Sequence, residues 1–328
     1  MSAATLVVRG IGELATCDPV WGDAPGVVRG AALAAAGELL TYVGSDDGLA
    51  AVDVAPDAVE VDALGMAVIP GFVDAHTHIV WLGDRSGEYA QRAAGMSYEQ
   101  IAAQGGGIMA TVHATREGSL EALTAAARSR AARMLRLGTT TVEVKSGYGL
   151  DHDAELRQLE AARALDADPD LPDVVPTYLP LHAPPPSPRE EFLASVLAEG
   201  LPRAAPLARF VDAFCEAGAY TVDECERLFS AARAAGLRPK LHAEQRSRSG
   251  GALLAARAGA ISADHLEHAS DDDLRALAGA SVVGVILPGA TLVLGGPPPP
   301  GRRLLDAGAQ VAVPPTATRA PATRSRCR

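Results

Sequence analysis

Eight short apolar runs alternate with helical segments over most of this chain, and this alternation limits its fold more than any other feature. The runs lie between Ala67 and Val313, and Ala-, Arg- and Leu-rich stretches with helical periodicity separate most of them. The clearest stretches are 120–137, 154–165, 222–235 and 271–278. Strands that alternate with helices form parallel βαβ units. Eight such units predict an α/β fold of the (β/α)8, TIM-like barrel type, with an open doubly wound sheet as the alternative.

The N-terminal part of the chain has a different pattern. Residues 1–65 contain short apolar runs of mixed periodicity that Gly and Pro interrupt, which is typical of a small β unit. We therefore predict that residues 1–65 form the N-terminal part of a small β domain. Residues 66–313 are predicted to form the barrel.

Bulk composition excludes several classes of protein. Hydrophobic residues make up 48% of the 328, which is enough for a sizeable core. A net charge of −11, with no basic stripe before the last few residues, argues against nucleic acid as a partner. No apolar run is long enough for a membrane span, and no secretory signal is evident. Four cysteines without a C-x-x-C pair favour the reducing cytoplasm.

Histidines gather at the ends of the predicted strands. In a (β/α)8 barrel the catalytic groups lie at the C-terminal ends of the strands. Six of the eight histidines fall at such ends, namely His76, His78, His182, His242, His265 and His268. A buried strand has little other use for these side chains, so the pattern predicts a functional site at the mouth of the barrel.

The segment Asp74-Ala75-His76-Thr77-His78 is the sharpest signal for a metal site. Side chains alternate faces along a strand, so His76 and His78 point the same way and can reach one ion. His242, at the fifth run, is the natural third ligand, and His265, at the sixth, is either a ligand or a general base. Three protein ligands with one open position suit a hydrolytic zinc or iron site. Two histidines near a strand end by chance are the alternative.

Two further residues have properties that suit substrate binding. Arg85 can hold a carboxylate through two hydrogen bonds, although a solvated surface arginine is the alternative. Tyr148 lies between two glycines on the loop after the second run, where a tyrosine that only packs is the alternative. The glycines of 105–107 lack the Lys-Ser/Thr of a phosphate-binding P-loop.

Residues from about 5 to 313 resemble the imidazolonepropionase family of metal-dependent amidohydrolases. The segment VDAHTH indicates only the superfamily, whereas AAQGGGI and EVKSGYGL are specific to this family, and PTYLPLHA, KLHAEQ and SADHLEH agree with it. The resemblance implies a barrel with a small β-sandwich domain. It also implies a homodimeric, cytoplasmic enzyme that hydrolyses 4-imidazolone-5-propanoate to N-formimidoyl-L-glutamate in histidine degradation.

Position by position, the resemblance assigns roles to nine residues. It makes His76, His78 and His242 the ligands of a divalent ion, zinc or iron, and His265 the catalytic histidine that activates a metal-polarised water. The substrate-binding residues would be Arg85, Tyr98, Tyr148, His182 and Gln245. Some relatives carry Glu where Gln245 stands, and an amide cannot be a general base.

A lysine that bridges two metals in some amidohydrolases has no counterpart here. That lysine lies on the fourth strand, and the fourth run, FVDAFCE, contains none. We therefore expect one metal ion. Lys145, which ends the second run, is expected to be structural or to support the metal ligands.

The chain departs from the family pattern after the eighth run. The family pattern there is V-A-x-A-T-D-C-N-P-G-T, in which the Asp binds the metal and is another candidate for the base, whereas residues 314–321 are PPTATRAP. A GC-rich coding of ATDCNPGT, read after loss of its first base, gives PPTATRAP. This match indicates a one-base frameshift after Val313, real or a sequencing error, with 314–328 an out-of-frame disordered tail. A genuine divergent tail is the alternative.

The frameshift hypothesis affects what the chain can do. Without the Asp and the last barrel elements, we expect the chain as given to be inactive. Another amidohydrolase acting on a cyclic amide or amidine is the alternative within enzymes. A non-catalytic protein that keeps metal affinity is the alternative outside them.

Overall fold

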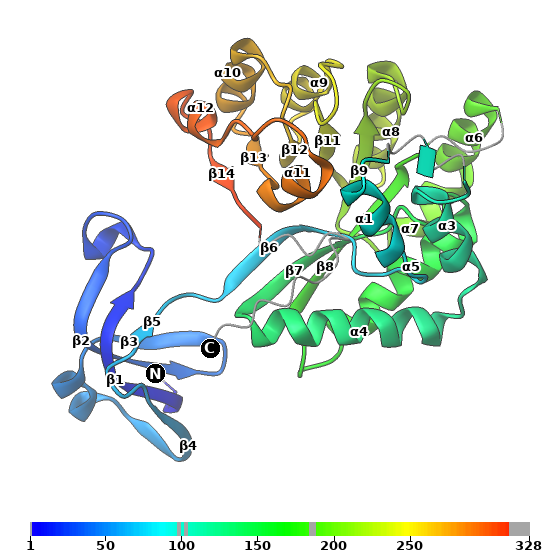
Figure 1. Ribbon diagram of the computed structural model, residues 1–328. Coiled ribbons are helices and arrows are strands. Elements are labelled where there is room, and N and C mark those ends of the chain that lie inside the picture. Colours follow the sequence, from blue (N-terminus) through cyan, green and yellow to red (C-terminus); the bar gives the residue numbers. More distant parts are fainter. Residues whose placement is uncertain (1, 97–99, 102–103, 184–187, 315–328) are drawn as a thin grey trace. The chain divides into compact units, whose positions relative to one another are not determined.

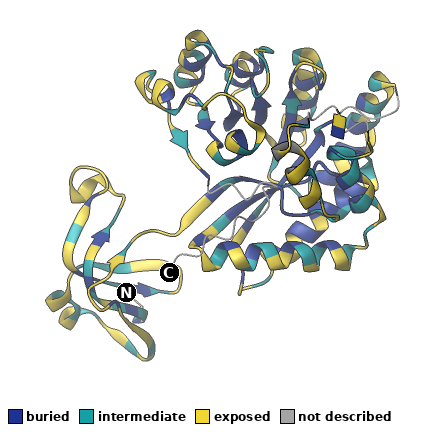
Figure 2. Cartoon of the chain, viewed as in Figure 1, coloured by how far each residue is buried: buried dark blue, intermediate teal, exposed yellow. Residues whose placement is uncertain are grey.

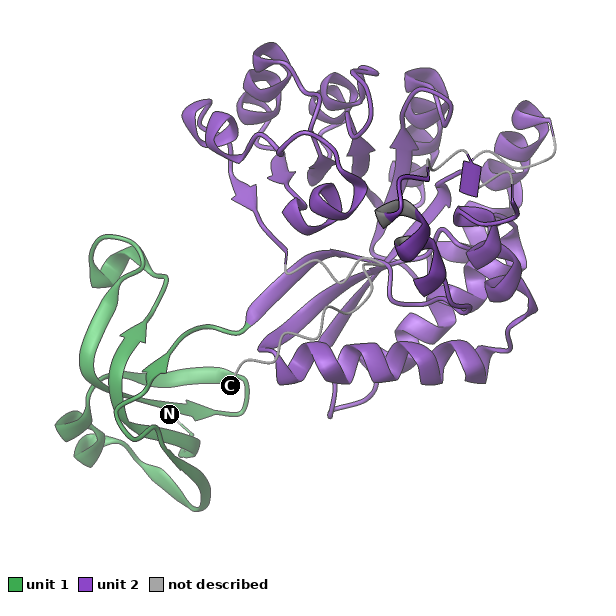
Figure 3. Cartoon of the chain, viewed as in Figure 1, with its two compact units in different colours: residues 1–71 green, residues 72–328 purple. Residues whose placement is uncertain are grey.

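The structure, a computed structural model, describes residues 2–96, 100–101, 104–183 and 188–314 (Figure 1). The chain forms two compact units, residues 1–71 and 72–328, which are distinguished by colour in Figure 3. Within the described residues, no helix has the length and apolar character needed to cross a membrane.

The first unit is built on one five-stranded sheet. Its strands are β1 (Ala4–Ala15), β2 (Val27–Ala36), β3 (Leu39–Ser45), β4 (Val54–Asp62) and β5 (Ala67–Val68). The order is β3-β2-β1-β4, and β5 pairs with another part of β1. The pairs β1–β2 and β2–β3 are antiparallel, whereas β4 and β5 run parallel to β1. Two 3₁₀ turns, Pro19–Trp21 and Asp46–Ala51, lie between the strands. The predicted small β unit is present as this sheet.

The second unit contains the eight parallel strands that the apolar runs predict. They are β6 (Phe72–Thr77), β7 (Thr139–Lys145), β8 (Asp173–Leu181), β9 (Phe210–Cys215), β11 (Leu241–Ala243), β12 (Ser262–His265), β13 (Val283–Val285) and β14 (Val311–Ala312). A short strand, β10 (Arg238–Pro239), pairs with β9 just before β11. The eight strands pair in chain order from β6 to β14, which gives seven strand pairs. This strand order is that of a (β/α)8 barrel, because in a doubly wound sheet the order of the strands reverses at a switch point within the sheet.

Helices connect the strands on their outer side (Figure 1). They are α1 (Ser86–Ala93), α3 (Ile108–Glu117), α4 (Leu120–Arg136), α5 (His152–Asp166), α6 (Arg189–Ser195), α7 (Leu201–Ala204), α8 (Val222–Ala234), α9 (Gly251–Arg257), α10 (Asp271–Gly279), α11 (Pro288–Leu294) and α12 (Gly301–Asp306), with a π-helical turn, Val196–Gly200, between α6 and α7. The four predicted helical stretches correspond to α4, α5, α8 and α10. Their first residues are set by the side-chain caps Ser119, Asp151, Thr221 and Ser270, which accept backbone N–H bonds.

The largest core lies between β8–β12 and the helices outside them. Leu228 and Phe229 of α8 pack in this cluster with Leu241 of β11 and Leu274 of α10, all inaccessible or nearly so. Figure 2 shows the same pattern, with buried strands and helices exposed on their outer faces. The strands that carry His242 and His265 are therefore held by tight packing, which fixes their ends.

We expect the Phe229→Ala substitution to lower the free energy of unfolding by about 3–5 kcal/mol, because it leaves a cavity in a close-packed core. Leu137→Ala serves as the control, since Leu137 is 69% exposed and its truncation should change stability by no more than about 0.5 kcal/mol. Urea unfolding followed by circular dichroism measures both. Equal losses in the two variants would contradict the assignment of this core.

Candidate metal centre and active site

Three histidines from two strands converge at one end of the barrel. His76 lies in β6, His78 follows that strand, and His242 lies in β11. All three are buried, and one nitrogen from each lies within 4.8 Å of the others. Nε2 of His242 is 3.4 Å from Nε2 of His78. Two nitrogens bound tetrahedrally to one zinc ion would be about 3.4 Å apart, so this group could hold a metal ion.

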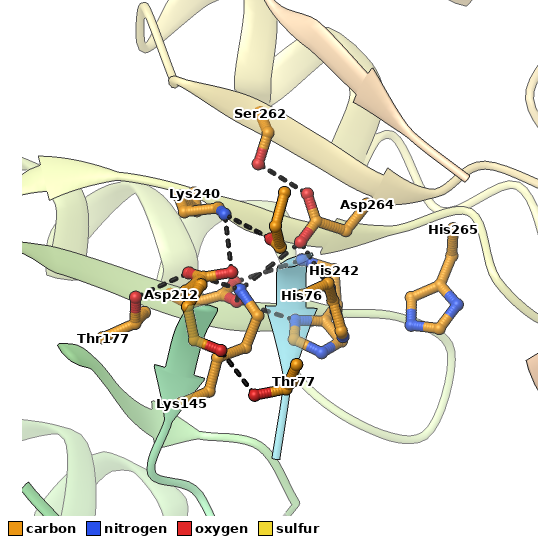
Figure 4. Close-up of polar contacts among 12 residues, drawn as sticks. His76, Thr77, Lys145, Thr177, Asp212, Lys240, His242, Ser262, Asp264 and His265 are labelled. Atoms are coloured by element: carbon orange, nitrogen blue, oxygen red, sulfur yellow. Dashed lines mark hydrogen bonds and ion pairs between the residues drawn. The ribbon is translucent and has the colours of Figure 1, made fainter. Parts of the chain in front are cut away.

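Carboxylates lie behind two of these imidazoles (Figure 4). Nδ1 of His76 is 2.6 Å from Oδ2 of Asp264 and hydrogen-bonded to it. Nδ1 of His242 is 2.9 Å from Oδ2 of Asp212, although it is not aligned as a hydrogen bond. A carboxylate at Nδ1 favours the tautomer with its proton there, which leaves the lone pair of Nε2 for a metal. The donor set therefore fits a cation.

A buried lysine, Lys145, contacts both of these carboxylates, and a second, Lys240, shares Glu143 with it. Nζ of Lys145 lies 2.7 Å from Asp212, 2.9 Å from Glu143 and 3.4 Å from Asp264. Lys240 contacts Glu143 at 2.7 Å. They are the only two lysines of the chain. We call Glu143, Lys145, Asp212, Lys240 and Asp264 the charge layer.

The charge layer keeps Lys145 protonated in spite of its burial. Burial acts to lower the pKa of Lys145, but the carboxylates of Asp212, Glu143 and Asp264 outweigh it and raise that pKa above its ordinary value. An ammonium with three carboxylate neighbours is not available as a nucleophile or for carboxylation. The contacts with Asp212 and Asp264 place Lys145 behind His242 and His76.

Four of the histidines are neutral at ordinary pH, namely His76, His78, His182 and His265. Burial and then the charge of Lys145 hold the pKa of His76 well below its usual value, and burial and His182 do the same for His78. Burial, followed by the neighbouring His242, lowers the pKa of His182 to about 4 and that of His265 to about 3. Neutral imidazoles have the free lone pairs that metal binding and proton uptake require.

Three further predicted residues surround the three-histidine group. The ring of His265 lies 5.3 Å from those of His76 and His242, centroid to centroid. His182 stacks on His78 at 5.0 Å, and the Tyr148 ring lies 5.5 Å from His78 and 5.4 Å from His182. The structure therefore brings together six of the residues that the sequence singled out.

For the remaining predicted residues, Arg85, Gln245 and Tyr98, the described part of the chain shows no polar contact with the histidines. Arg85 is paired with Glu88, with Nε of Arg85 2.7 Å from Oε1 of Glu88 and Nη2 bonded to Oε2. Within the described part of the chain, neither Arg85 nor Gln245 forms a hydrogen bond or ion pair with the histidine cluster. Tyr98 lies outside the described residues.

The sequence analysis missed most of the charge layer. Glu143, Asp212, Lys240 and Asp264 were not singled out, although each is a charged residue within or beside an apolar run. A buried charge is costly unless it is paired, so opposite charges inside barrel strands were an available signal. Which charge pairs with which depends on strand neighbours and register, which the sequence does not contain.

The comparison with solved structures identifies the fold. An adenosine deaminase from Xanthomonas campestris, solved with bound zinc, superimposes with a TM-score of 0.68 at 18% identity, covering 95% of this chain and 69% of that one. An amidohydrolase from an environmental sample of the Sargasso Sea superimposes with a TM-score of 0.61 at 18% identity, covering 94% of this chain and 68% of that one. At such identities the likeness concerns the fold alone. The fold and the three-histidine group together are those of an amidohydrolase-type barrel.

Sequence relatives define the family. The imidazolonepropionase of Deinococcus radiodurans is 46% identical over 93% of this chain and 76% of its own length. The imidazolonepropionase of Rubrobacter xylanophilus is 46% identical over 93% of this chain and 71% of its own length. That of Anaeromyxobacter dehalogenans is 47% identical over 94% of this chain and 75% of its own length. A scan against protein-family models gave no match. The chain belongs to the imidazolonepropionase family, as the sequence motifs predicted.

The buried neutral histidines should make the metal-free protein less stable in mild acid. Their pKa values are lower in the folded chain than the ordinary 6.5, to about 4 for His182 and about 3 for His265. The unfolded chain therefore binds more protons below about pH 6.5, and the free energy of unfolding falls as pH falls towards these values. Each such histidine contributes up to about 1.4 kcal/mol per pH unit.

Urea unfolding in the presence of a chelator between about pH 7 and pH 5 measures this slope. His182→Gln should reduce the slope by the share of one histidine, whereas the exposed His113→Gln should leave it unchanged. A slope as steep in His182→Gln as in the parent would show that His182 is not a buried neutral histidine.

Proposed function

We propose that this chain is an imidazolonepropionase, which hydrolyses the ring C–N bond of 4-imidazolone-5-propanoate to give N-formimidoyl-L-glutamate in histidine degradation. The observation that supports this most is the buried group of His76, His78 and His242 at the barrel mouth of a chain in this family. Buried imidazoles with carboxylates behind two of them suit a metal that activates water for attack on a cyclic amide.

We propose that the group holds one divalent ion, zinc or iron, on His76, His78 and His242. Such an ion, when bound, polarises a carbonyl and lowers the pKa of water towards neutrality. A single ion is favoured because β9 contains no lysine and because three carboxylates surround Lys145. The charge layer contains two positive and three negative side chains, so its net charge of −1 also favours a cation above it.

His265 is proposed to take the proton of the attacking water. Burial and the neighbouring His242 lower its pKa to about 3, so the imidazole is neutral and has a free lone pair. Its Nδ1 lies 4.0 Å from Oε1 of Glu267, beyond hydrogen-bonding distance. Because the family's Asp after the eighth strand is the other candidate for this role, His265 is the assignment to be tested first.

Four other side chains and Tyr98 are proposed to hold the substrate. Tyr148 and His182 border the histidines and can bind polar groups of the ring. Arg85 would bind the propanoate through its Nη1 edge, because its hydrogen bonds to Glu88, within the described part of the chain, use Nε and Nη2. Gln245 can donate and accept hydrogen bonds but cannot act as a base.

The proposal also covers the cellular location, the partners and the oligomeric state of the protein. We infer a cytoplasmic enzyme that acts on a small molecule and forms a homodimer when full length, without nucleic acid or membrane as partners. The net charge of −11 supports the exclusion of nucleic acid. We also keep the proposed division into a β domain (1–65), a barrel (66–313) and an out-of-frame segment (314–328).

One observation favours a second candidate, a protein that binds metal without catalysis. The metal-binding group contains three histidines and no carboxylate among the described residues, and 314–321 has no Asp. A carboxylate ligand balances the charge of the ion and orients its water. The chain as given could then keep the ion and lack turnover.

The three metal ligands can be tested by substitution. His76→Ala, His78→Ala and His242→Ala should each reduce the zinc content of the dialysed protein to a small fraction of one ion per chain, because each removes one ligand. His268→Ala is the control, since His268 also follows a barrel strand but is exposed. Mass spectrometry of the bound metal gives the result. Near-stoichiometric zinc in His242→Ala would mean that another residue is the third ligand.

The reaction itself can be tested by replacing residues 314–321 with ATDCNPGT. We expect this version to consume imidazolone propanoate and the 328-residue chain to show little or no turnover, because only the former supplies the carboxylate. Equal rates would show that the Asp is dispensable. Turnover of another cyclic amide or amidine without imidazolone propanoate would establish a different amidohydrolase. The frameshift would be refuted if the genomic DNA after codon 313 did not encode ATDCNPGT in the neighbouring reading frame.

A further inference from the structure

The loop between β7 and α5 is held by an unusual set of hydrogen bonds. We call residues 146–150 the Tyr148 loop. Four consecutive backbone N–H groups of this loop donate to two side chains of α5. Gly147 donates to Oε2 of Glu155 at 2.6 Å, Gly149 and Leu150 to its Oε1 at 2.7 and 2.8 Å, and Tyr148 to Oε1 of Gln158 at 3.1 Å.

These contacts are separate from the start of the helix. The N-cap of α5 is Asp151, which accepts a bond from Ala154 N at 2.8 Å. Glu155 is only 1% exposed, and no arginine or lysine forms a salt bridge with it among the described residues. A buried carboxylate is costly unless hydrogen bonds compensate it. Burial raises the pKa of Glu155 to about 7, and the Ser146 hydroxyl and the loop N–H groups oppose that rise.

The loop needs such support because its backbone is strained. Gly147 has φ +103° and Leu150 φ +53°, and the left-handed region is unfavourable for leucine. Space is also tight, since a Cβ on Gly149 would lie 2.5 Å from the backbone N of Glu155. The hydrogen bonds to Glu155 and Gln158 hold the loop against α5 in this conformation.

The loop and α5 also contact the metal-site histidines. The Tyr148 ring lies 5.5 Å from that of His78. Gly147 O is 2.8 Å from Nδ1 of His182, and a carbonyl can only accept, so Nδ1 carries the proton and Nε2 is left as an acceptor. Nε2 of Gln158 donates to Val80 O at 2.7 Å, just beyond His78. Gln158 thus connects the loop with the segment that follows β6, and Glu155 holds the loop from the same helix.

We infer that Glu155 is a positioning residue for substrate binding. Its carboxylate, together with the amide of Gln158, fixes the Tyr148 ring beside His78 and the Gly147 carbonyl that sets the tautomer of His182. This inference rests on the proposed function, in which Tyr148 and His182 contact the substrate. It adds residues that lie behind those contacts and act through them.

The test uses the zinc-loaded 328-residue chain and imidazole-4-propanoate, an analogue of the substrate that has no amide bond to hydrolyse. Calorimetry measures its dissociation constant. We expect Glu155→Gln to weaken binding about tenfold or more, because an amide places an N–H where loop N–H groups need an acceptor. Zinc content should not change. Glu160→Gln is the matched control, because Glu160 is an exposed residue of the same helix.

A double-mutant cycle separates positioning from a merely structural role. If Glu155 acts through Tyr148, Glu155→Gln should weaken binding much less in the Tyr148→Ala background than in the parent. Additive losses, or a lower melting temperature with unchanged affinity, would overturn the inference. If Glu155→Gln does not fold, Glu155→Asp and Gln158→Met replace it, and each should give a smaller, non-additive loss.

Hydrogen exchange of the peptide containing 146–150 gives a readout that does not depend on the substrate. Glu155→Gln should accelerate exchange of these amides and leave other segments as in Glu160→Gln. If the parent does not bind the analogue, the proposed substrate is wrong, and exchange alone decides the inference about Glu155. Unchanged exchange in Glu155→Gln would then refute it.

Discussion

The ammonium of Lys145, set among Asp212, Glu143 and Asp264, is the contact on which the site depends. It joins residues from β7, β9 and β12, and two of its partners lie behind His242 and His76. Removal of one member of a buried ion pair typically costs about 3–5 kcal/mol, because the remaining charge is left uncompensated. The same ion pairs therefore join three barrel strands and orient His76 and His242, two of the candidate metal-binding histidines.

Much of the fold was accessible from the sequence because its signals are local. Eight apolar runs and helical stretches with Ser, Thr or Asp caps define strands and helices without knowledge of their neighbours. His76 and His78 were accessible for the same reason, since alternation along one strand puts both on one face. His242 was accessible from its position at the fifth run, and the family motifs agreed with that choice. Its approach to His78 brings together positions far apart in the chain, which no local pattern predicts.

The charge layer could not be predicted in the same way. Asp212 and Asp264 are visible as acidic residues in apolar runs, but their partners are determined by which strands are adjacent and in which register. The role of Arg85 is hard to predict from the sequence for a different reason. Its bond to Glu88 is local, three residues along the chain, and does not reveal whether its other edge faces a substrate. For this residue a role follows only from the chemistry of the proposed ligand.

The histidines differ in how firmly their protons are placed. Nδ1 of His76 and Nδ1 of His182 each have an acceptor, Asp264 and Gly147 O, so their tautomers are fixed. Nδ1 of His78 and of His265 has no hydrogen-bond partner among the described residues. For His78, metal binding at Nε2 would place the proton on Nδ1. His265 has no such constraint, so its proton can reside on either nitrogen. A histidine that must take up and release a proton benefits from this freedom, whereas a ligand or substrate-binding residue benefits from a fixed tautomer.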